Sequence, residues 1–214
     1  MDLSYLREHP GEILGLALEH LRIALLALGI ALPIAVVVGT AAVRVRMLRQ
    51  PVSWVVGFLY TIPSLAMLAF LIPTQGLGLR PTVILLVMYA QVFLVRNIIT
   101  GLLGVDGATL EAARGLGMTP LQLLRQVWIP LALPVIIAGI RIALVTVIGL
   151  AVLGGWVRAG GLGELLFEGI STDNPAKVLA GVIAISALAM LTDIVLRGLE
   201  RLTAAARARR AART

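Results

Sequence analysis

Few side chains in this sequence could build an active site. The chain contains no cysteine and only two histidines, His9 and His20, both near its N-terminus. Its single lysine, Lys177, stands between an alanine and a valine. The sequence Gly-Lys-Ser/Thr, with which a phosphate-binding loop holds ATP, is therefore missing. We expect no catalytic residue, no metal site and no cofactor bound by this chain.

Polar residues with a specific arrangement occur instead in residues 104–130, between two long apolar runs. Asp106 is placed to cap a first short helix, which we expect to end at Gly115 or Gly117. The sequence Thr-Pro-Leu-Gln at 119–122 is a capping box and predicts a second short helix. Small residues that let another chain approach closely lie at the end of the first helix: Ala112, Ala113 and Gly117. This pattern indicates a compact docking surface, whereas most such loops simply lie on a membrane.

The composition is that of a protein embedded in a membrane. Hydrophobic residues make up 59% of the 214 residues, charged residues 14%, and the mean hydropathy is +1.00. A soluble domain would carry about 25% charged residues. The net charge of +7 comes from arginines at the edges of apolar runs and in the C-terminal tail. Basic residues so placed contact anionic lipid headgroups, so we expect membrane lipid and no nucleic acid as a partner.

The apolar runs predict an all-α integral membrane protein, a single domain over residues 1–214 with five transmembrane helices. We treat the second run as one span followed by a turn, and we expect Pro130 and Pro134 to redirect the chain into the fourth span. Arginines follow the first span, occur within residues 104–130 and fill the basic tail. The positive-inside rule then places the N-terminus outside and the C-terminus in the cytoplasm. The predicted spans are residues 21–43, 52–73, 80–103, 131–153 and 176–198, and the tail is residues 199–214.

Several polar groups interrupt the second and third spans. Irregular backbone at membrane depth is tolerated where it faces protein or a water-filled cavity. These residues therefore either line a translocation pathway or form a packed kink. The second span contributes Tyr60, Thr61, Pro63 and Ser64, and the third contributes Gln91 and Asn97.

One arginine and one aspartate stand out in the two predicted spans nearest the C-terminus. Arg141 is inside the fourth span, where an arginine costs about 2.5–3.5 kcal/mol to insert. Asp193, near the cytoplasmic end of the fifth, is the only acid within a predicted span. The two side chains either pair with each other or extend separately to the membrane surface.

The outer connection between the fourth and fifth spans, residues 154–177, is long and rich in glycine. Loops longer than roughly 12–15 residues usually have a function. We expect a re-entrant half-helix that gates the pathway or contacts an extracytoplasmic partner, with a plain connector as the alternative. The residues assigned to this role are Gly160, Gly161, Gly163 and Glu164.

Residues 111–130 contain Glu-Ala-Ala, a glycine after three further residues and, after nine more, Val-Trp-Ile-Pro. This spacing resembles the EAA signature of permease subunits of binding-protein-dependent ABC importers. The resemblance implies that residues 104–130 form a cytoplasmic coupling loop seated in a groove of a separate ATPase. Glu111 as a solvated acid and Gly117 as a plain helix cap are the alternatives. The residues implied in coupling are Glu111, Ala112, Ala113, Gly117 and Pro130.

The same resemblance implies the rest of an assembly. It implies two permease subunits, identical or homologous, and two ATPase subunits that hold ATP and magnesium. A separate extracytoplasmic substrate-binding protein would deliver substrate, because no soluble domain is evident in this chain. The location would be the bacterial cytoplasmic (inner) membrane. ATP binding would turn the pathway outward and hydrolysis would reset it, which is alternating access.

Four further stretches resemble the osmoprotectant group of these permeases, which import glycine betaine, carnitine, choline or proline betaine. They are residues 60–78, 95–106, 133–143 and 158–170. Methionine-type importers share the five-span plan and are the nearest alternative. Aromatic cages hold quaternary ammonium ions well, but aromatic residues are only 5% of this chain and we predict no cluster suited to a cage. High-affinity recognition is therefore expected of the binding protein.

Two other classes of membrane protein fit the sequence less well. An ion-coupled secondary carrier would favour inverted repeats and acids at mid-membrane, and neither is evident. A membrane-embedded enzyme would need several Asp, His or Cys side chains facing one pocket. Both histidines instead fall near the outer N-terminus.

Overall fold

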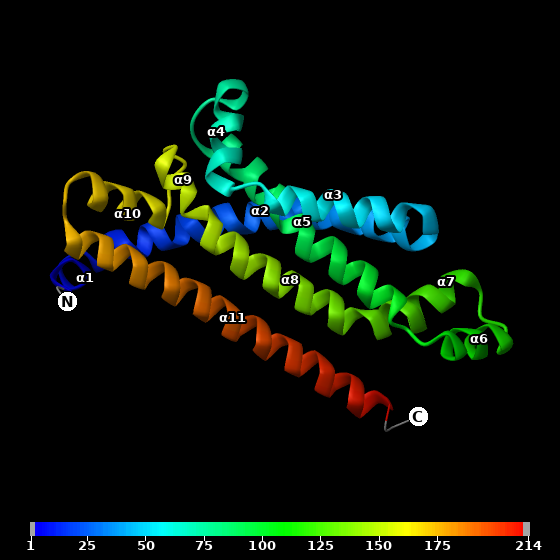
Figure 1. Ribbon diagram of the computed structural model, residues 1–214. Helices are drawn as coiled ribbons and strands as arrows, with labels where there is room; N and C mark the ends of the chain where they lie inside the picture. Colours follow the sequence, from blue (N-terminus) through cyan, green and yellow to red (C-terminus); the bar gives the residue numbers. More distant parts are fainter. Residues whose placement is uncertain (1–2, 212–214) are drawn as a thin grey trace.

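The computed structural model describes residues 3–211, without the side chains at 199 and 201–211, and these residues form helices and turns with no strand. Helix α5 packs against both α2 and α8, and α11 packs against α8 (Figure 1). The all-α membrane fold is confirmed. The predicted basic tail continues α11, and its last residues, 212–214, lie outside the described part. The long helices are α2 (Pro10–Arg44), α5 (Leu79–Leu103), α8 (Ile129–Ala151) and α11 (Pro175–Ala211).

Shorter elements connect the long helices. Figure 1 shows α1 and α10 at one end of them, and α6, α7 and the end of α11 at the other. The two ends of the chain therefore lie at opposite ends of the bundle, as an odd number of crossings requires. These elements are α1 (Ser4–Glu8), a 3-10 turn (Arg46–Leu48), α3 (Arg49–Thr61), α4 (Ser64–Gln75), α6 (Gly107–Gly115), α7 (Pro120–Gln122), a π-helical turn (Leu123–Trp128), α9 (Leu153–Trp156) and α10 (Leu162–Ser171).

The long helices approach one another through small residues. A Cβ on Gly39 of α2 would come 2.7 Å from Cγ2 of Ile98 on α5, so this crossing requires glycine. Small residues let helix backbones pack closely in a membrane, where packing drives association. Because α5 is central, 61% of its most apolar stretch is buried, against 11% for α11. A stripe of alanines on α2 is fully buried: Ala24, Ala27, Ala31 and Ala35.

The second predicted span is not one straight helix. α3 and α4 meet at Ile62 and Pro63 with a bend of 92°. Pro63 has no backbone N–H and disfavours a helical conformation in the residue before it, and Ile62 accordingly has a ψ of 128°. The sequence predicts a helix break within residues 52–73, as pathway lining or as a packed kink, and the structure has this break at Ile62 and Pro63. Among the described residues, four helices can cross a membrane, or five if the bent pair crosses as one span.

Pro130 and Pro134 do not redirect the chain as predicted. The helix that begins at Pro120 continues to Trp156, with Pro134 inside α8. A π-helical turn directly before Pro130 widens the helix and accommodates a residue that lacks a backbone N–H. The second arm of the loop is thus continuous with the next spanning helix.

Candidate functional site

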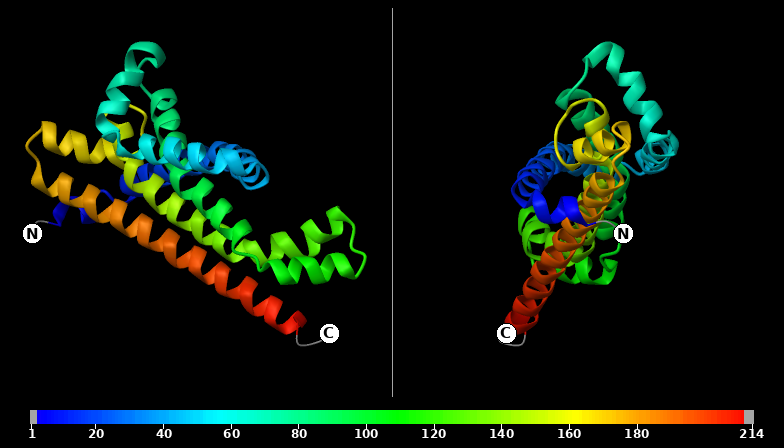
Figure 2. Two further views of the ribbon diagram at one scale, coloured as in Figure 1. Left: turned by 45° about the vertical axis from the view of Figure 1, so that its right-hand side comes forward. Right: turned by 90° about the vertical axis from the view of Figure 1, so that its left-hand side faces the viewer.

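The connection between α5 and α8 forms a helical hairpin, the α6–α7 hairpin (residues 106–128), which projects beyond the long helices (Figure 2). The Asp106 carboxylate caps α6 by accepting hydrogen bonds from the backbone N–H groups of Ala108 (3.4 Å) and Thr109 (3.3 Å). α6 ends at Gly115. Gly117 follows with a φ of +79°, which favours glycine. The predicted cap and helix end are both confirmed.

The second arm of the α6–α7 hairpin is held as firmly. Thr119 Oγ1 accepts a hydrogen bond from the Gln122 N–H at 3.3 Å, and Gln122 Oε1 accepts one from the Thr119 N–H at 2.8 Å. This is the predicted capping box. At the base of the hairpin, Trp128 Nε1 donates to the carbonyl of Leu102 on α5 at 2.8 Å. A force applied to the hairpin therefore reaches both α5 and α8.

The five EAA-type residues divide between the surface and the packing of this hairpin. Glu111 and Ala112 are exposed, as is Gly117. Glu111 makes no hydrogen bond or ion pair within the part of the chain that the structure describes. Ala113 is buried, 7% exposed, and Pro130 is half-buried. The hairpin thus presents a free carboxylate next to small residues.

The bend between α3 and α4 is fixed against α5. The hydroxyl of Tyr89, on α5, donates a hydrogen bond to the carbonyl of Ile62. That carbonyl lies where the helical hydrogen-bond pattern ends, so this bond satisfies it. Ser64 is half-buried and its three companions are exposed. Four of the predicted pathway residues lie together at this bend: Tyr60, Thr61, Pro63 and Ser64.

Gln91 and Asn97 lie in helix interfaces, away from the bend. Gln91 is buried, and its Nε2 donates to the carbonyl of Ala31 on α2 at 3.1 Å. Asn97 Nδ2 donates to the carbonyl of Phe93 at 2.8 Å. Asn97 also packs against α8, because a Cβ added to Gly139 of α8 would lie 2.3 Å from the Cβ of Asn97. These two side chains therefore attach α5 to its neighbours.

An aromatic cluster lies beside the bend. The ring of Tyr60 is 5.9 Å from that of Tyr89 and 5.4 Å from that of Phe93, centroid to centroid, and meets Phe93 edge-on. The sequence predicts no cluster suited to an aromatic cage. It does not reveal that these three rings lie together, because the bend and α4 separate Tyr60 from Tyr89 and Phe93 along the chain. The one local signal is that Tyr89 and Phe93 lie one helical turn apart.

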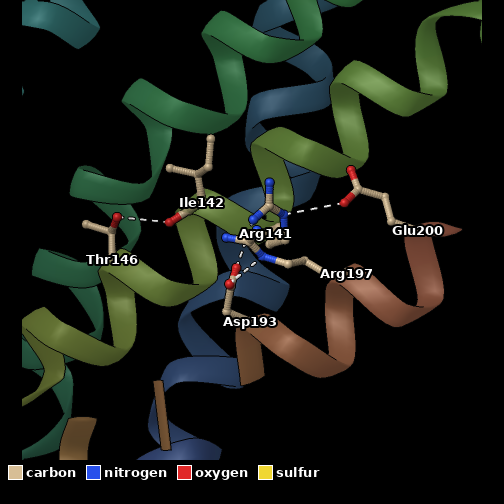
Figure 3. Close-up of polar contacts among 6 residues, drawn as sticks. All are labelled: Arg141, Ile142, Thr146, Asp193, Arg197 and Glu200. Carbon is tan, nitrogen blue, oxygen red and sulfur yellow. Dashed lines mark hydrogen bonds and ion pairs between the residues drawn. The ribbon is translucent and has the colours of Figure 1, made fainter. Parts of the chain in front are cut away.

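Arg141 on α8 is neutralised within the chain (Figure 3). Its Nη1 lies 2.8 Å from Oδ1 of Asp193 on α11, and its Nε lies 3.5 Å from Oε2 of Glu200. Arg197 Nε lies 2.6 Å from the other Asp193 oxygen. The side chains of Arg141 and Asp193 are only 20% and 23% exposed. Of the two alternatives left by the sequence, the structure has the ion pair, which joins α8 to α11.

The outer loop is fastened to α2. The backbone N–H of Gly161 donates to Glu19 Oε2 at 2.9 Å. Gly160 and Gly161 have φ values of +93° and +77°, and a Cβ on Gly160 would lie 2.4 Å from Oε1 of Glu19. Next to Glu19, the fully buried His20 donates from Nε2 to the carbonyl of Ile148 on α8 at 2.9 Å. α2, α8 and the outer loop are thus joined at one point.

The start of α10 packs against α9 with almost no space between the backbones. A Cβ on Gly155 would lie 2.1 Å from the carbonyl carbon of Gly163. Glu164, the next residue, is half-buried. Sequence reasoning missed Glu19 and His20 as functional candidates. The signal that could have found them is a carboxylate and an imidazole side by side in an apolar run.

A bundle of apolar helices long enough to cross a membrane, with a capped hairpin at one end, is the architecture of a multi-pass membrane protein. Residues 31–204 match the family described as binding-protein-dependent transport system inner membrane component, and the chain belongs to this family. Membership places the chain in the inner membrane. It also implies an ATPase that uses ATP and a substrate-binding protein as partners.

Relatives of known name match nearly the whole chain. The choline transport system permease protein OpuBB of Bacillus subtilis (strain 168) is 37% identical over 199 residues, which are 93% of this chain and 92% of the relative. The glycine betaine/carnitine/choline transport system permease protein OpuCB of the same organism is 38% identical over the same shares of both chains. The osmoprotectant import permease protein OsmW of Salmonella typhimurium is 38% identical over 92% of this chain and 94% of its own.

Solved structures of importers have the same fold. A chain of the inward-facing MetNI methionine ABC transporter superposes with a TM-score of 0.72 and 26% identity, over 89% of this chain and 98% of its own. A chain of an amino acid ABC transporter superposes with a TM-score of 0.74 over 95% of this chain and 97% of its own. Its 18% identity supports the fold alone.

Proposed function

We propose that this chain is the permease subunit of an ATP-driven importer of quaternary ammonium osmoprotectants, such as glycine betaine, choline, carnitine or proline betaine. The observation that carries the proposal is the similarity to permeases named for choline and for glycine betaine, carnitine and choline transport, over 93% of the chain. Such a subunit holds no ATP itself, and the absence of a Gly-Lys-Ser/Thr sequence agrees with that division of labour.

Coupling to the ATPase takes place at the α6–α7 hairpin. Glu111 offers a free carboxylate, and the small residues Ala112 and Gly117 permit close approach of another chain. Ala113 and Pro130 belong to the packing that keeps the hairpin in shape. Because both arms are capped and the base is tied to α5, the hairpin transmits displacement instead of absorbing it.

The complete transporter contains two permease subunits, identical or homologous, two ATPases with ATP and magnesium, and a separate extracytoplasmic binding protein. This chain forms one transmembrane domain with its N-terminus outside and its C-terminus in the cytoplasm. Two permeases are needed because so few helices enclose a polar pathway poorly. The outer loop at Gly160, Gly161, Gly163 and Glu164 serves as outer gate or as contact for the binding protein.

Transport proceeds by alternating access. ATP binding draws the two ATPases together and moves both hairpins, which opens the pathway to the outside for substrate from the binding protein. Hydrolysis lets the hairpins separate and returns the pathway to the cytoplasm. The bend between α3 and α4 is the part of the chain best suited to line this pathway, since its residues Tyr60, Thr61 and Pro63 are exposed.

A methionine-type importer is the second candidate. The specific observation in its favour is the superposition on MetNI at 26% identity with a TM-score of 0.72. The osmoprotectant proposal has the higher identity in its support, 37–39% in permeases named for choline and carnitine.

Uptake by cells that express the whole transporter tests the assignment. Cells that lack their own osmoprotectant and methionine importers would be given labelled glycine betaine, choline, carnitine or methionine. The proposal predicts uptake of at least one quaternary ammonium compound and none of methionine. Methionine uptake alone would replace the proposal with its competitor.

A further inference from the structure

Arg96 is an arginine within the apolar helix α5. It lies on α5, seven residues before the helix ends at Leu103, and its side chain is exposed. It makes no hydrogen bond or ion pair with any residue that the structure describes. Its guanidinium reaches α3, because a Cβ on Gly57 would lie 3.0 Å from Nη2 of Arg96. This free cation contrasts with Arg141, which Asp193 neutralises.

The aromatic cluster lies one helical turn from the contact between Arg96 and Gly57. α3 and α5 run antiparallel here, because Gly57 is next to Arg96 while Tyr60, three residues later, is next to Phe93, three residues earlier. Residues three apart share a helix face. The rings of Tyr60 and Phe93 therefore lie one helical turn, about 5 Å, from the level of Arg96.

The cluster is both accessible and fixed in place. Tyr60 is 46% exposed, whereas Tyr89 is 4% exposed and is bonded through its hydroxyl to the carbonyl of Ile62 at the bend. Phe93 lies two residues from the midpoint of α5, so the rings are near half the depth of the membrane. A polar solute crossing beside the bend would meet these rings and the guanidinium together.

We propose that Tyr60, Phe93 and Arg96 form a low-affinity site in the permease for a zwitterion that carries a quaternary ammonium and a carboxylate. The ammonium rests against the aromatic rings by cation–π attraction, and the carboxylate accepts hydrogen bonds from the guanidinium. The proposal of this site rests on the proposed function and narrows the class of substrate that the permease favours. Glycine betaine and carnitine satisfy both parts, whereas choline has no carboxylate and brings a second positive charge close to Arg96.

Uptake by proteoliposomes that contain the complete transporter tests this site. With binding protein and substrate saturating, the maximal uptake rates of glycine betaine and choline are compared for wild type and Arg96→Gln. We expect at least a tenfold loss for glycine betaine and an unchanged or higher rate for choline. Arg80→Gln, an exposed arginine near the start of the same helix, is the matched control and should leave both rates unchanged.

Two further variants keep the test decisive if Arg96→Gln does not assemble. Arg96→Lys retains the charge but not the planar fork and should lose less glycine betaine uptake than Arg96→Gln. Tyr60→Leu keeps an apolar side chain but removes the ring, and should lower uptake of both substrates several-fold. An equal loss of both substrates in Arg96→Gln or Arg96→Lys, or no loss in any variant, would overturn this site while leaving the proposed function intact. Wild-type transporter that takes up none of glycine betaine, choline, carnitine and proline betaine would overturn the proposed function itself.

Discussion

The two ends of the molecule are stabilised by different kinds of contact. The α6–α7 hairpin takes its shape from its own caps, Asp106 on one arm and Thr119 with Gln122 on the other. The outer loop depends on contacts with other elements, above all the bond from the Gly161 N–H to Glu19 of α2. One end is preformed and can receive a partner, while the other depends on contacts that can break and form again.

The glycines of the two ends show the same difference. A Cβ on Gly107, Gly115 or Gly117 of the hairpin would meet nothing within 4 Å. At the outer end, a Cβ on Gly155 or Gly160 would come within 2.1 or 2.4 Å of other atoms. These glycines of the hairpin therefore have room for a side chain, whereas the two glycines at the outer end have none.

The largest effect is expected where two backbones touch. In Gly155→Ala, the new Cβ would lie 2.1 Å from the carbonyl carbon of Gly163 and would force α9 and α10 apart. Overpacking of this kind costs typically about 1–3 kcal/mol, and we expect the upper part of that range because no flexible side chain can yield. Thermal unfolding of the purified protein measures the loss. Gly149→Ala, which enters open space, is the control, and equal melting temperatures for both variants would contradict the account.

A smaller effect is expected at the bond between Glu19 and Gly161. Glu19→Ala leaves a buried N–H without a partner, which costs about 1–3 kcal/mol. Glu19→Gln keeps an acceptor oxygen and should restore most of the stability. The same thermal measurement distinguishes them, with Glu8→Ala on α1 as an exposed acid that should change nothing. Identical losses in Glu19→Ala and Glu19→Gln would show that the carboxylate does more than accept this bond.

The smallest effect is expected in the hairpin. Asp106→Ala removes the cap of α6 and should cost about 1 kcal/mol of local helix stability. Faster hydrogen exchange in residues 107–115 would report it, with the melting temperature of the whole protein unchanged. Asp106→Asn retains a good cap and should exchange like the wild type. If loss of the cap also made exchange faster in the outer loop, the two ends would not be held independently.

This contrast also explains what the sequence could and could not predict. The caps of the α6–α7 hairpin were predictable because Asp106 and Thr119 act on residues two or three positions away. Glu19 and Gly161 are 142 residues apart, and nothing local marks their contact. The helix break at Pro63 was predictable because proline acts locally, whereas the angle of 92° between α3 and α4 depends on packing against α5.

The ion pair and the aromatic cluster lie between these two cases in how far the sequence could predict them. A charge inside the membrane demands a partner, so Arg141 and Asp193 could be named as a possible pair, but their distance required the structure. No side chain of the aromatic cluster needs a partner in this way. Only the packing of α3 against α5 brings Tyr60, Tyr89 and Phe93 together.

The central claim is that the α6–α7 hairpin receives the ATPase, and crosslinking tests it most directly. The chain has no cysteine, so Ala112→Cys, at an exposed position of α6, gives a unique site for a photoreactive maleimide label. Ser171→Cys, exposed at the end of α10, gives the matched site at the outer end. We predict that illumination of the assembled transporter joins the ATPase to Ala112→Cys and not to Ser171→Cys. The account would be contradicted if the Ala112→Cys transporter is fully labelled and imports substrate normally, yet forms no crosslink to the ATPase.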